Sequence, residues 1–404
     1  MVIPVAAAGP LADTLLALFL VLLAAKVGDE IFRRIGQPAI VGEILAGVVI
    51  GPSVLGIVSP GETLEVFAEL GVVFLLFWVG LETRLSDLRE VGGVATRVGV
   101  LGMAIPLVAG FAAAEAFGAE TKTSLFVGAS LVATSVGITS AVLIDLGALK
   151  SLAARTILGA AVIDDILAMV LLAVAVGIAE GNGLDVTSVL LVIALAVGFV
   201  VFVGFGGTRI AARWPDIFHA PRFAESPLMP AVILCLGLAA FSAEIGLAAI
   251  IGAFLAGMIV AETRDRGDFE QEVAPLYAFF PPFFFVFIGL QVDLGSLADL
   301  EVLGALAGVT LLALVTKFAG AWLGARSLGA RNALAVGVGM VPRGEVGIIV
   351  AGIGATAGVI SGSLFTVIVG MSILTTLVAP PLLKRVLGRS DDTGEAVPAG
   401  ERPV

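Results

Sequence analysis

The sequence has few of the charged side chains that a water-soluble protein of its length carries on its surface. Only 14% of its 404 residues are charged and 59% are hydrophobic, and it holds one tyrosine and one histidine. An average soluble domain is about one quarter charged. Most of a folded exterior faces solvent, so this composition excludes a soluble protein and indicates one that lies in a membrane.

Two further scarcities exclude other classes. The single cysteine, Cys235, excludes a disulfide framework and a thiolate-bound metal cluster. The net charge of −11 argues against nucleic acid as a partner, because phosphate binding needs clustered Lys and Arg. We expect no cofactor.

Long apolar runs dominate what is there. A helix needs about 20 mostly apolar residues to cross a bilayer, and such runs recur with only short polar connections. We predict an all-α polytopic membrane protein. The first run lacks a basic leader and an obvious cleavage site, so we expect a retained helix there. The thirteen predicted spans are 11–32, 38–56, 64–82, 92–117, 123–147, 152–179, 186–211, 228–244, 246–262, 273–293, 301–325, 332–358 and 363–387.

The basic residues predict the orientation of these helices. Cytoplasmic loops are enriched in Lys and Arg. With the N-terminus outside, seventeen of the 22 basic residues fall in predicted cytoplasmic connections, and the predicted outer loops hold only Lys122. We therefore expect a protein of the cell (cytoplasmic) membrane whose C-terminus, with a short tail at 391–404, lies in the cytoplasm. The seventeen are Arg33, Arg34, Arg84, Arg89, Arg97, Lys150, Arg155, Arg209, Arg213, Arg222, Arg264, Arg266, Arg326, Arg331, Lys384, Arg385 and Arg389.

Three short motifs recur in the second half of the chain in the same order. The offset of 209 or 210 residues spans seven predicted helices, an odd number, so equivalent helices run in opposite directions. Such inverted repeats are typical of secondary transporters. Coincidence in a sequence of low diversity is the alternative. The matching segments are 41–47 with 251–257, 79–81 with 288–290, and 136–138 with 346–348.

Two equivalent positions of this repeat predict interrupted helices that cross. The segment 128–141 is unusually polar for mid-membrane, and its partner, 337–347, has Pro342 among glycines that tolerate unwinding. Non-helical backbone at this depth is permitted only inside protein or beside a wet cavity. The breaks therefore predict the substrate site, with Thr134 and Ser135 among its ion-binding residues. A glycine-rich packing face is the alternative.

Three charged residues deep inside predicted spans form one set. Asp164 and Asp165 are adjacent in 152–179, and Lys317 lies in 301–325. Neighbouring helical side chains point about 100° apart, so the aspartates cannot chelate one ion as a simple pair. We expect one aspartate to face a water-accessible ion site and the other to meet Lys317 as a fixed countercharge. A carboxylate that binds either a proton or a metal cation couples the two by competition. A purely structural Asp164–Lys317 pair is the alternative.

Arg343 and Glu345 form the other charged set within the membrane. We predict that they support the interrupted helix by meeting freed backbone groups or Asp164; direct transport by Glu345 is the alternative. Glu43 is expected either to line an inner funnel or to pack at a helix interface. His219 is expected to be solvated in a cytoplasmic loop.

At these residues the chain resembles the monovalent cation:proton antiporter-2 (CPA2) family, specifically its bacterial and archaeal sodium/proton antiporters. The resemblance implies a homodimer of thirteen-helix protomers, each with a dimerisation domain and a core that moves as an elevator. It implies that Asp165 is the principal ion and proton carrier, and that Asp164 releases Lys317 when sodium binds. It also implies electrogenic exchange of two protons for each sodium ion. The matching motifs are 42–47, 51–56, 133–137, Asp164-Asp165, Thr316-Lys317 and 341–345.

We expect residues 1–390 to form one transmembrane unit. Its dimerisation domain would come from helices 11–56 and 228–262, its linker from 186–211, and its core from 64–179 and 273–387.

The sequence thus predicts a sodium (or lithium)/proton antiporter, a transporter and not an enzyme. Its expected partners are sodium ions, protons, membrane lipid and a second copy of the chain. Potassium/proton exchange is one alternative, and an ion channel is another. An intramembrane aspartyl protease would need aspartates on facing helices, close enough to share a proton, which two neighbours on one helix do not provide.

Overall fold

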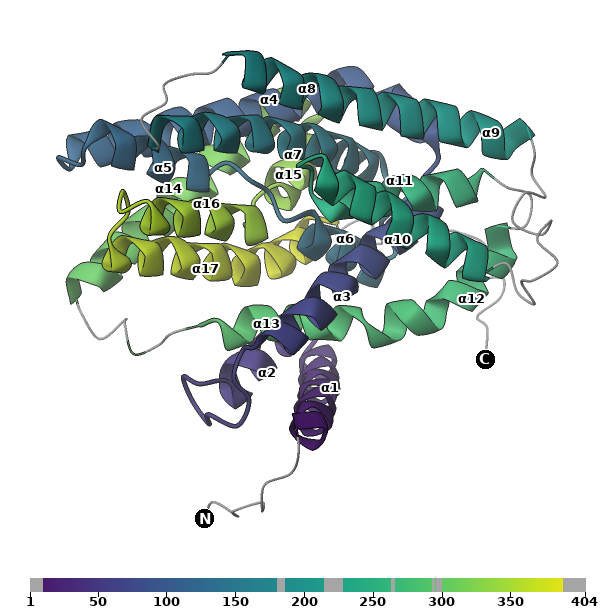
Figure 1. Ribbon diagram of the computed structural model, residues 1–404, viewed down its shortest axis with the longest axis horizontal. Coiled ribbons are helices and arrows are strands. Elements are labelled where there is room, and N and C mark those ends of the chain that lie inside the picture. Colours follow the sequence, from purple (N-terminus) through teal and green to yellow (C-terminus); the bar gives the residue numbers. More distant parts are fainter. Residues whose placement is uncertain are drawn as a thin grey trace.

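The computed structural model describes residues 10–179, 186–213, 228–262, 266–292, 295 and 300–387. All regular secondary structure within these residues is helical, and many long helices lie side by side (Figure 1). Seven described helices are individually long and apolar enough to cross a membrane. The predicted all-α polytopic membrane fold is confirmed. His219, Arg222, Arg264 and the tail 391–404 lie outside the described residues.

Each predicted span corresponds to one described helix or to consecutive helical pieces. The undivided helices are α1 (Pro10–Arg34), α2 (Ala39–Ile50), α3 (Glu62–Leu81), α4 (Leu85–Ala116), α7 (Leu152–Ala179), α10 (Leu228–Glu244), α11 (Ala249–Ala261), α14 (Leu300–Ala325) and α17 (Gly362–Leu387). The divided spans are α5 (Thr121–Ser130) with α6 (Val136–Asp145), α8 (Val186–Val201) with the π-helix η1 (Phe202–Gly207) and α9 (Thr208–Arg213), α12 (Arg266–Phe279) with α13 (Pro281–Leu290), and α15 (Ala330–Gly339) with α16 (Glu345–Thr356).

The two predicted interruptions are confirmed, at 131–135 and at 340–344. Other boundaries differ from the prediction for local reasons. α4 begins at Leu85 rather than at 92, because a helix can continue through charged residues outside the apolar layer. The predicted span 273–293 is divided at Phe280, since Pro281 and Pro282 start a new helix.

Contacts between glycines show the inverted repeat in space. A Cβ at Gly47 would lie 2.1 Å from the carbonyl oxygen of Val286, and Gly47 packs directly on Gly289. In the same way a Cβ at Gly80 would lie 2.2 Å from the carbonyl oxygen of Phe254, and Gly80 packs on Gly257. Gly47 and Gly257 are 210 residues apart, and Gly80 and Gly289 are 209 apart. The α2–α13 and α3–α11 contacts are therefore equivalents, and only glycine permits their close approach.

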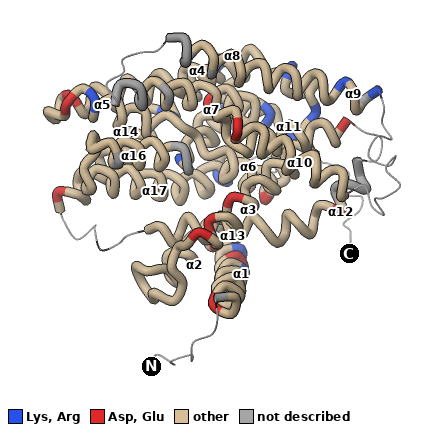
Figure 2. Tube along the Cα trace, in the orientation of Figure 1, with Lys and Arg blue, Asp and Glu red and all other residues tan. Residues whose placement is uncertain are grey.

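Polar contacts bring predicted cytoplasmic connections together. Arg33 pairs with Asp145 at 2.9 Å, Arg97 donates to Ser327 at 3.0 Å, and Lys384 donates to the carbonyl of Gly36 at 2.7 Å. At the predicted outer side, Thr123 donates to the carbonyl of Val359 at 2.9 Å. Each bond joins segments that the charge pattern assigns to the same side. Figure 2 shows Lys and Arg gathered toward one end of the long helices, at the right of the view.

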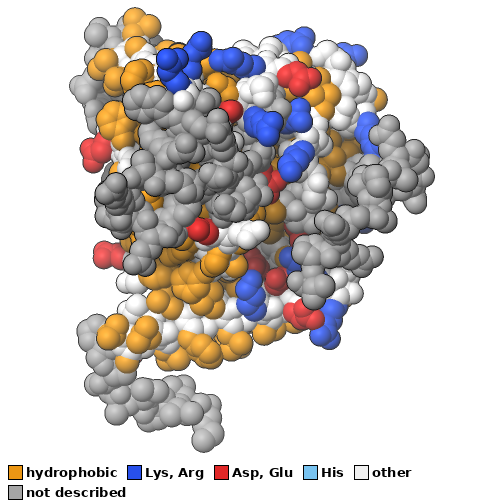
Figure 3. All heavy atoms as spheres, turned by 90° about the vertical axis from the view of Figure 1, so that its right-hand side faces the viewer, with side chains coloured by type: hydrophobic (Ala, Val, Ile, Leu, Met, Phe, Trp, Pro, Cys, Tyr) orange, Lys and Arg blue, Asp and Glu red, His pale blue; other side chains and the backbone are white. Residues whose placement is uncertain are grey.

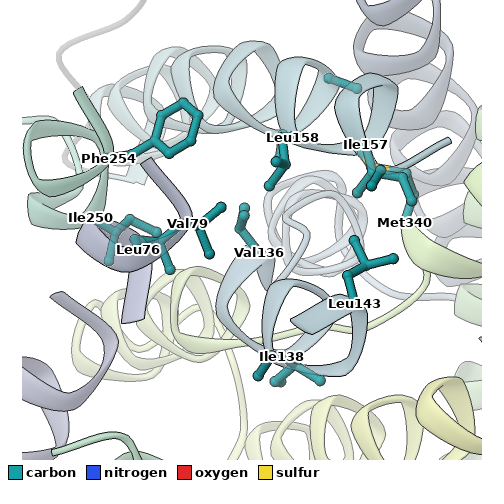
Figure 4. Packing of buried hydrophobic residues seen from close by; sticks show 14 of the residues in the cluster. Leu76, Val79, Val136, Ile138, Leu143, Ile157, Leu158, Ile250, Phe254 and Met340 are labelled. Carbon is teal, nitrogen blue, oxygen red and sulfur yellow. The ribbon is translucent and has the colours of Figure 1, made fainter. Parts of the chain in front are cut away.

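Two groups of helices surround the middle of the molecule. In the first group, α3 packs on α11 and α13, and α13 packs on α2. In the second group, α4 packs on α7 and α14, and α14 packs on α17. α8 contacts α7, whereas η1 and α9 contact α11, so the predicted linker touches both groups. Apolar side chains fill the space between the groups (Figure 4). These include Leu76 and Val79 of α3, Ile250 and Phe254 of α11, Val136 and Ile138 of α6, and Ile157 and Leu158 of α7.

Candidate functional site

The two helix interruptions meet in the interior. The amide of Ser135 donates to the carbonyl of Pro342 at 2.8 Å, and the Thr139 hydroxyl donates to the carbonyl of Gly339 at 2.6 Å. A Cβ at position 344 would lie only 2.7 Å from that of Ser135, so a glycine lets the segments touch. Each broken helix thus satisfies some of the backbone groups that the other has freed.

Asp164 and Lys317 form a fully buried ion pair beside this crossing. The Lys317 Nζ lies 2.9 Å from both carboxylate oxygens of Asp164, and both side chains have 0% exposure. Lys317 also donates to the carbonyl of Val132 in the first interruption. The amide of Thr134 donates to Asp164 at 3.0 Å. Asp164 is therefore held by a cation and by an unwound backbone, as a buried carboxylate requires.

Asp165 has different surroundings from its neighbour. It is buried, and it lines a narrow cavity between the two helix groups. The other lining residues are apolar and come from α3, α6, α7 and α11: Leu76, Val136, Leu158, Ala161, Val162, Ile250, Ile251 and Phe254. The two aspartates are thus separated by helix geometry, one in an ion pair and one at a cavity.

Arg343 crosses the second interruption and binds backbone. Its guanidinium donates to the carbonyls of Val341 at 3.3 Å and Ala313 at 3.2 Å. Its own amide donates to the Thr375 hydroxyl at 3.2 Å, and its carbonyl accepts from Thr376 at 2.8 Å. This arrangement suits the predicted support of the interrupted helix. Glu345 starts α16, and its side chain lies outside the described part of the structure.

The Thr134 and Ser135 side chains lie at the same crossing. The Thr134 hydroxyl donates to the carbonyl of Met340 at 3.4 Å, and the buried Ser135 Oγ has no hydrogen-bond partner among the described residues. Oxygen atoms from hydroxyls and unwound backbone are the ligands that a hard monovalent cation would use. Glu43 lies apart from this crossing, buried within α2.

The sequence matches a model of a known protein family. The family model described as "Sodium/hydrogen exchanger, transmembrane" matches residues 16–389, which is nearly the whole chain. The chain belongs to the sodium/hydrogen exchanger family.

Curated relatives of this exchanger match over almost their full length. The Na(+)/H(+)-K(+) antiporter GerN of Bacillus cereus is 37% identical, over 93% of this chain and 97% of its own length. The high-affinity Na(+)/H(+) antiporter NhaS3 of Synechocystis is 34% identical, over 98% of this chain and 93% of its own. The Na(+)/H(+) antiporter of Enterococcus hirae is 34% identical, over 91% and 96%.

A solved structure confirms the fold of this exchanger. The sodium proton antiporter MjNhaP1 of Methanocaldococcus jannaschii superimposes with a TM-score of 0.68. The match covers 93% of this chain and 100% of that one, at 21% identity.

Several groups at the crossing of the two breaks were not predicted from the sequence. Thr375 and Thr376 on α17 form hydrogen bonds with the backbone of Arg343. The carbonyl of Val132 accepts from Lys317, and the carbonyl of Ala313 accepts from the Arg343 guanidinium. The adjacent threonines in an apolar helix were a signal for the first pair. The carbonyls carry no signal in a sequence, because every residue has one.

Proposed function

We propose that this exchanger carries sodium or lithium ions in one direction and protons in the other, with Asp165 as the shared binding group. One observation carries the proposal: the Asp165 carboxylate lines a narrow cavity beside two crossing helix breaks, while its neighbour Asp164 is paired with a lysine. A charged group at mid-membrane is costly and marks an ion pathway by default.

Competition at one carboxylate couples the two ions. A proton on Asp165 removes the negative charge that attracts a cation, and a bound cation removes the affinity for a proton. The protonated and the cation-bound carboxyl groups each have zero net charge, whereas the empty carboxylate has one net negative charge. Loading therefore favours passage of the group through an apolar region. The apolar residues that α3 and α11 contribute to the cavity wall support this coupling. Moving an ionised Asp165 without a bound cation past these residues would be energetically unfavourable.

The Asp164–Lys317 pair supplies a second proton-linked group in this scheme. Burial disfavours a charged ammonium, and the Asp164 carboxylate offsets that cost at 2.9 Å. If a cation bound near Asp165 draws the Asp164 carboxylate away, Lys317 loses its partner and releases its proton. The two protons would then leave from Asp165 and Lys317 for each sodium ion that binds, which makes the exchange electrogenic.

Alternating access is proposed to arise by an elevator movement of a core relative to a dimerisation domain in a homodimer of the cell membrane. We keep the predicted orientation, with the N-terminus outside and the C-terminus in the cytoplasm. The helix groups support two bodies that slide past each other, since mainly apolar side chains meet between them. Glycine contacts tie α3 to α11 and α2 to α13. These contacts support a division in which α3 and α13 move with α2 and α11, although the sequence assigned 64–82 and 273–293 to the core.

Potassium/proton exchange is the second candidate. It is favoured by the relative GerN, which is 37% identical and is named as an Na(+)/H(+)-K(+) antiporter. The Asp165 carboxylate would serve either ion, so the transport assay must compare them.

Reconstitution in liposomes with an internal pH dye tests the proposal. Pulses of sodium, lithium and potassium are added outside proton-loaded vesicles, and alkalinisation of the lumen reports exchange. The wild type is expected to respond to sodium and lithium, and Asp165→Asn to respond to none, because an amide neither ionises nor binds a cation strongly. A stronger response to potassium than to sodium would select the second candidate.

Lys317→Ala in the same assay separates transport from coupling. In this variant Asp165 is expected still to bind either a proton or a cation, but the second proton, which Lys317 releases in the wild type, no longer takes part in the exchange. Undiminished exchange by Asp165→Asn would reject the carrier assignment. Current without any requirement for protons would indicate a channel.

A further inference from the structure

Three arginines gather where the linker helix reaches the start of α4. The Arg89 guanidinium of α4 lies over the Phe205 ring of η1, 4.4 Å from its centroid. Arg209 follows Phe205 by four residues and Arg213 follows by another four, so they continue the same face of α9, and both are exposed. We call Arg89, Arg209 and Arg213 the linker arginine cluster.

The positive charge of this cluster is not neutralised within the described part of the chain. There, neither Arg209 nor Arg213 pairs with a carboxylate, and Arg89 has the ring of Phe205 as its partner. Glu90, the residue after Arg89, accepts from Arg155 at 3.5 Å. Seen from this end of the molecule, Lys and Arg side chains gather over the upper part of the face (Figure 3).

Exposed apolar side chains adjoin the cluster on the same helix. Phe202 is 79% exposed, Ile210 is 56% exposed and Val201 is 50% exposed. In a membrane protein such side chains face acyl chains, while guanidiniums at the end of the same helix lie at headgroup level. A partner that fits both features has an anionic head and a hydrocarbon tail.

We propose that the linker arginine cluster binds an acidic phospholipid. Its phosphodiester would accept from the guanidiniums of Arg209 and Arg213, with Arg89 held close by its contact with Phe205. The acyl chains would lie over Phe202 and Ile210. Guanidinium groups match phosphate oxygens in geometry and are weakly hydrated, and basic pockets between transmembrane helices bind acidic headgroups.

The position of this site connects two parts of the fold. Arg89 belongs to the helix group of α4, α7 and α14, whereas η1 and α9 contact α11. π-helical turns are rare and often mark functional sites, and this one holds the ring on which Arg89 stacks. A bound headgroup would therefore link α4 to the linker. Binding itself does not depend on which ions the exchanger carries.

Native mass spectrometry of the detergent-solubilised full chain tests this site. Phosphatidylglycerol and phosphatidylcholine with the same acyl chains are titrated against the wild type and against Arg209→Gln/Arg213→Gln. The wild type is expected to retain phosphatidylglycerol in preference to phosphatidylcholine. The double variant is expected to bind phosphatidylglycerol at least about tenfold more weakly, with unchanged phosphatidylcholine binding.

Arg34→Gln/Arg97→Gln is the matched control, because it removes the same charge from exposed arginines that already bond Glu30 and Ser327. It is expected to bind phosphatidylglycerol as the wild type does. Equal binding by wild type and Arg209→Gln/Arg213→Gln would overturn the proposal, as would an equal loss in the control. Full displacement by glycerol phosphate would also overturn it, since the headgroup alone would then suffice. Arg89→Gln, expected to weaken binding as well, gives a second reading if the double variant does not fold.

Discussion

At the scale of single residues, the two neighbouring aspartates have opposite environments. Asp164 accepts from Lys317 and from the amide of Thr134, so its charge is balanced inside the protein. Asp165, one residue later, turns toward an apolar cavity. A single step along a helix therefore places one carboxylate in a buried ion pair and the other at a cavity.

The buried pair predicts strong energetic coupling. Lys317→Met alone leaves Asp164 as an unpaired buried charge and is expected to destabilise the protein by about 3–5 kcal/mol. Asp164→Asn alone leaves the ammonium unpaired and is expected to cost a similar amount. The double variant should be more stable than either single variant, because neither charge is left alone. Unfolding in detergent, followed by tryptophan fluorescence, gives the three values; simple additivity would show that the pair is not coupled.

At the scale of elements, glycines decide how closely helices approach. The α2–α13 and α3–α11 contacts place glycine backbone on glycine backbone, and the crossing of the two breaks needs Gly344 against Ser135. Arg343 then bridges the second break by bonding carbonyls of its own segment and of α14. Hydrogen bonds between the two segments and from this guanidinium thus satisfy some of the backbone groups that the breaks free.

Gly47→Ala tests the α2–α13 contact. Its Cβ would lie 2.1 Å from the carbonyl oxygen of Val286, so α2 and α13 must separate and the melting temperature should fall. Gly308→Ala is the matched control in α14, where a Cβ meets nothing within 4 Å. It is expected to be neutral or to stabilise the helix by up to about 1 kcal/mol. Equal melting temperatures for the two variants would contradict the packing argument.

At the scale of the whole molecule, much of the architecture could be predicted from the sequence. The length of each apolar run predicted the helices, and Pro342 among its glycines predicted one break while the repeat predicted the other. Lys317 was predicted as the countercharge of one of the two aspartates because few charges lie so deep, and the family resemblance implied that this aspartate is Asp164. The cavity wall from α3 and α11, and the carbonyls that hold Lys317 and Arg343, could not be predicted. They depend on where distant helices pass, which local patterns do not specify.

A further prediction at this scale concerns the net charge that the protein moves across the membrane in each transport cycle. The proposed exchange of two protons for one sodium ion would transfer one net charge, so we expect the cycle to respond to voltage by about 2.3 kcal/mol per 100 mV. In liposomes clamped at zero potential, net flux should stop where the sodium ratio equals the square of the proton ratio. Imposing a potential with potassium and valinomycin should move that null point. An unmoved null point would indicate electroneutral exchange.

The central claim is that one carboxylate holds either a proton or a cation. Proton release on sodium binding tests it most directly, in weakly buffered detergent solution with a pH dye. The wild type is expected to acidify the solution as sodium is added, with saturation, and to need more sodium at lower pH. Asp165→Asn should release no proton from that site. Sodium binding by the wild type without proton release, or equal release by Asp165→Asn, would contradict the account.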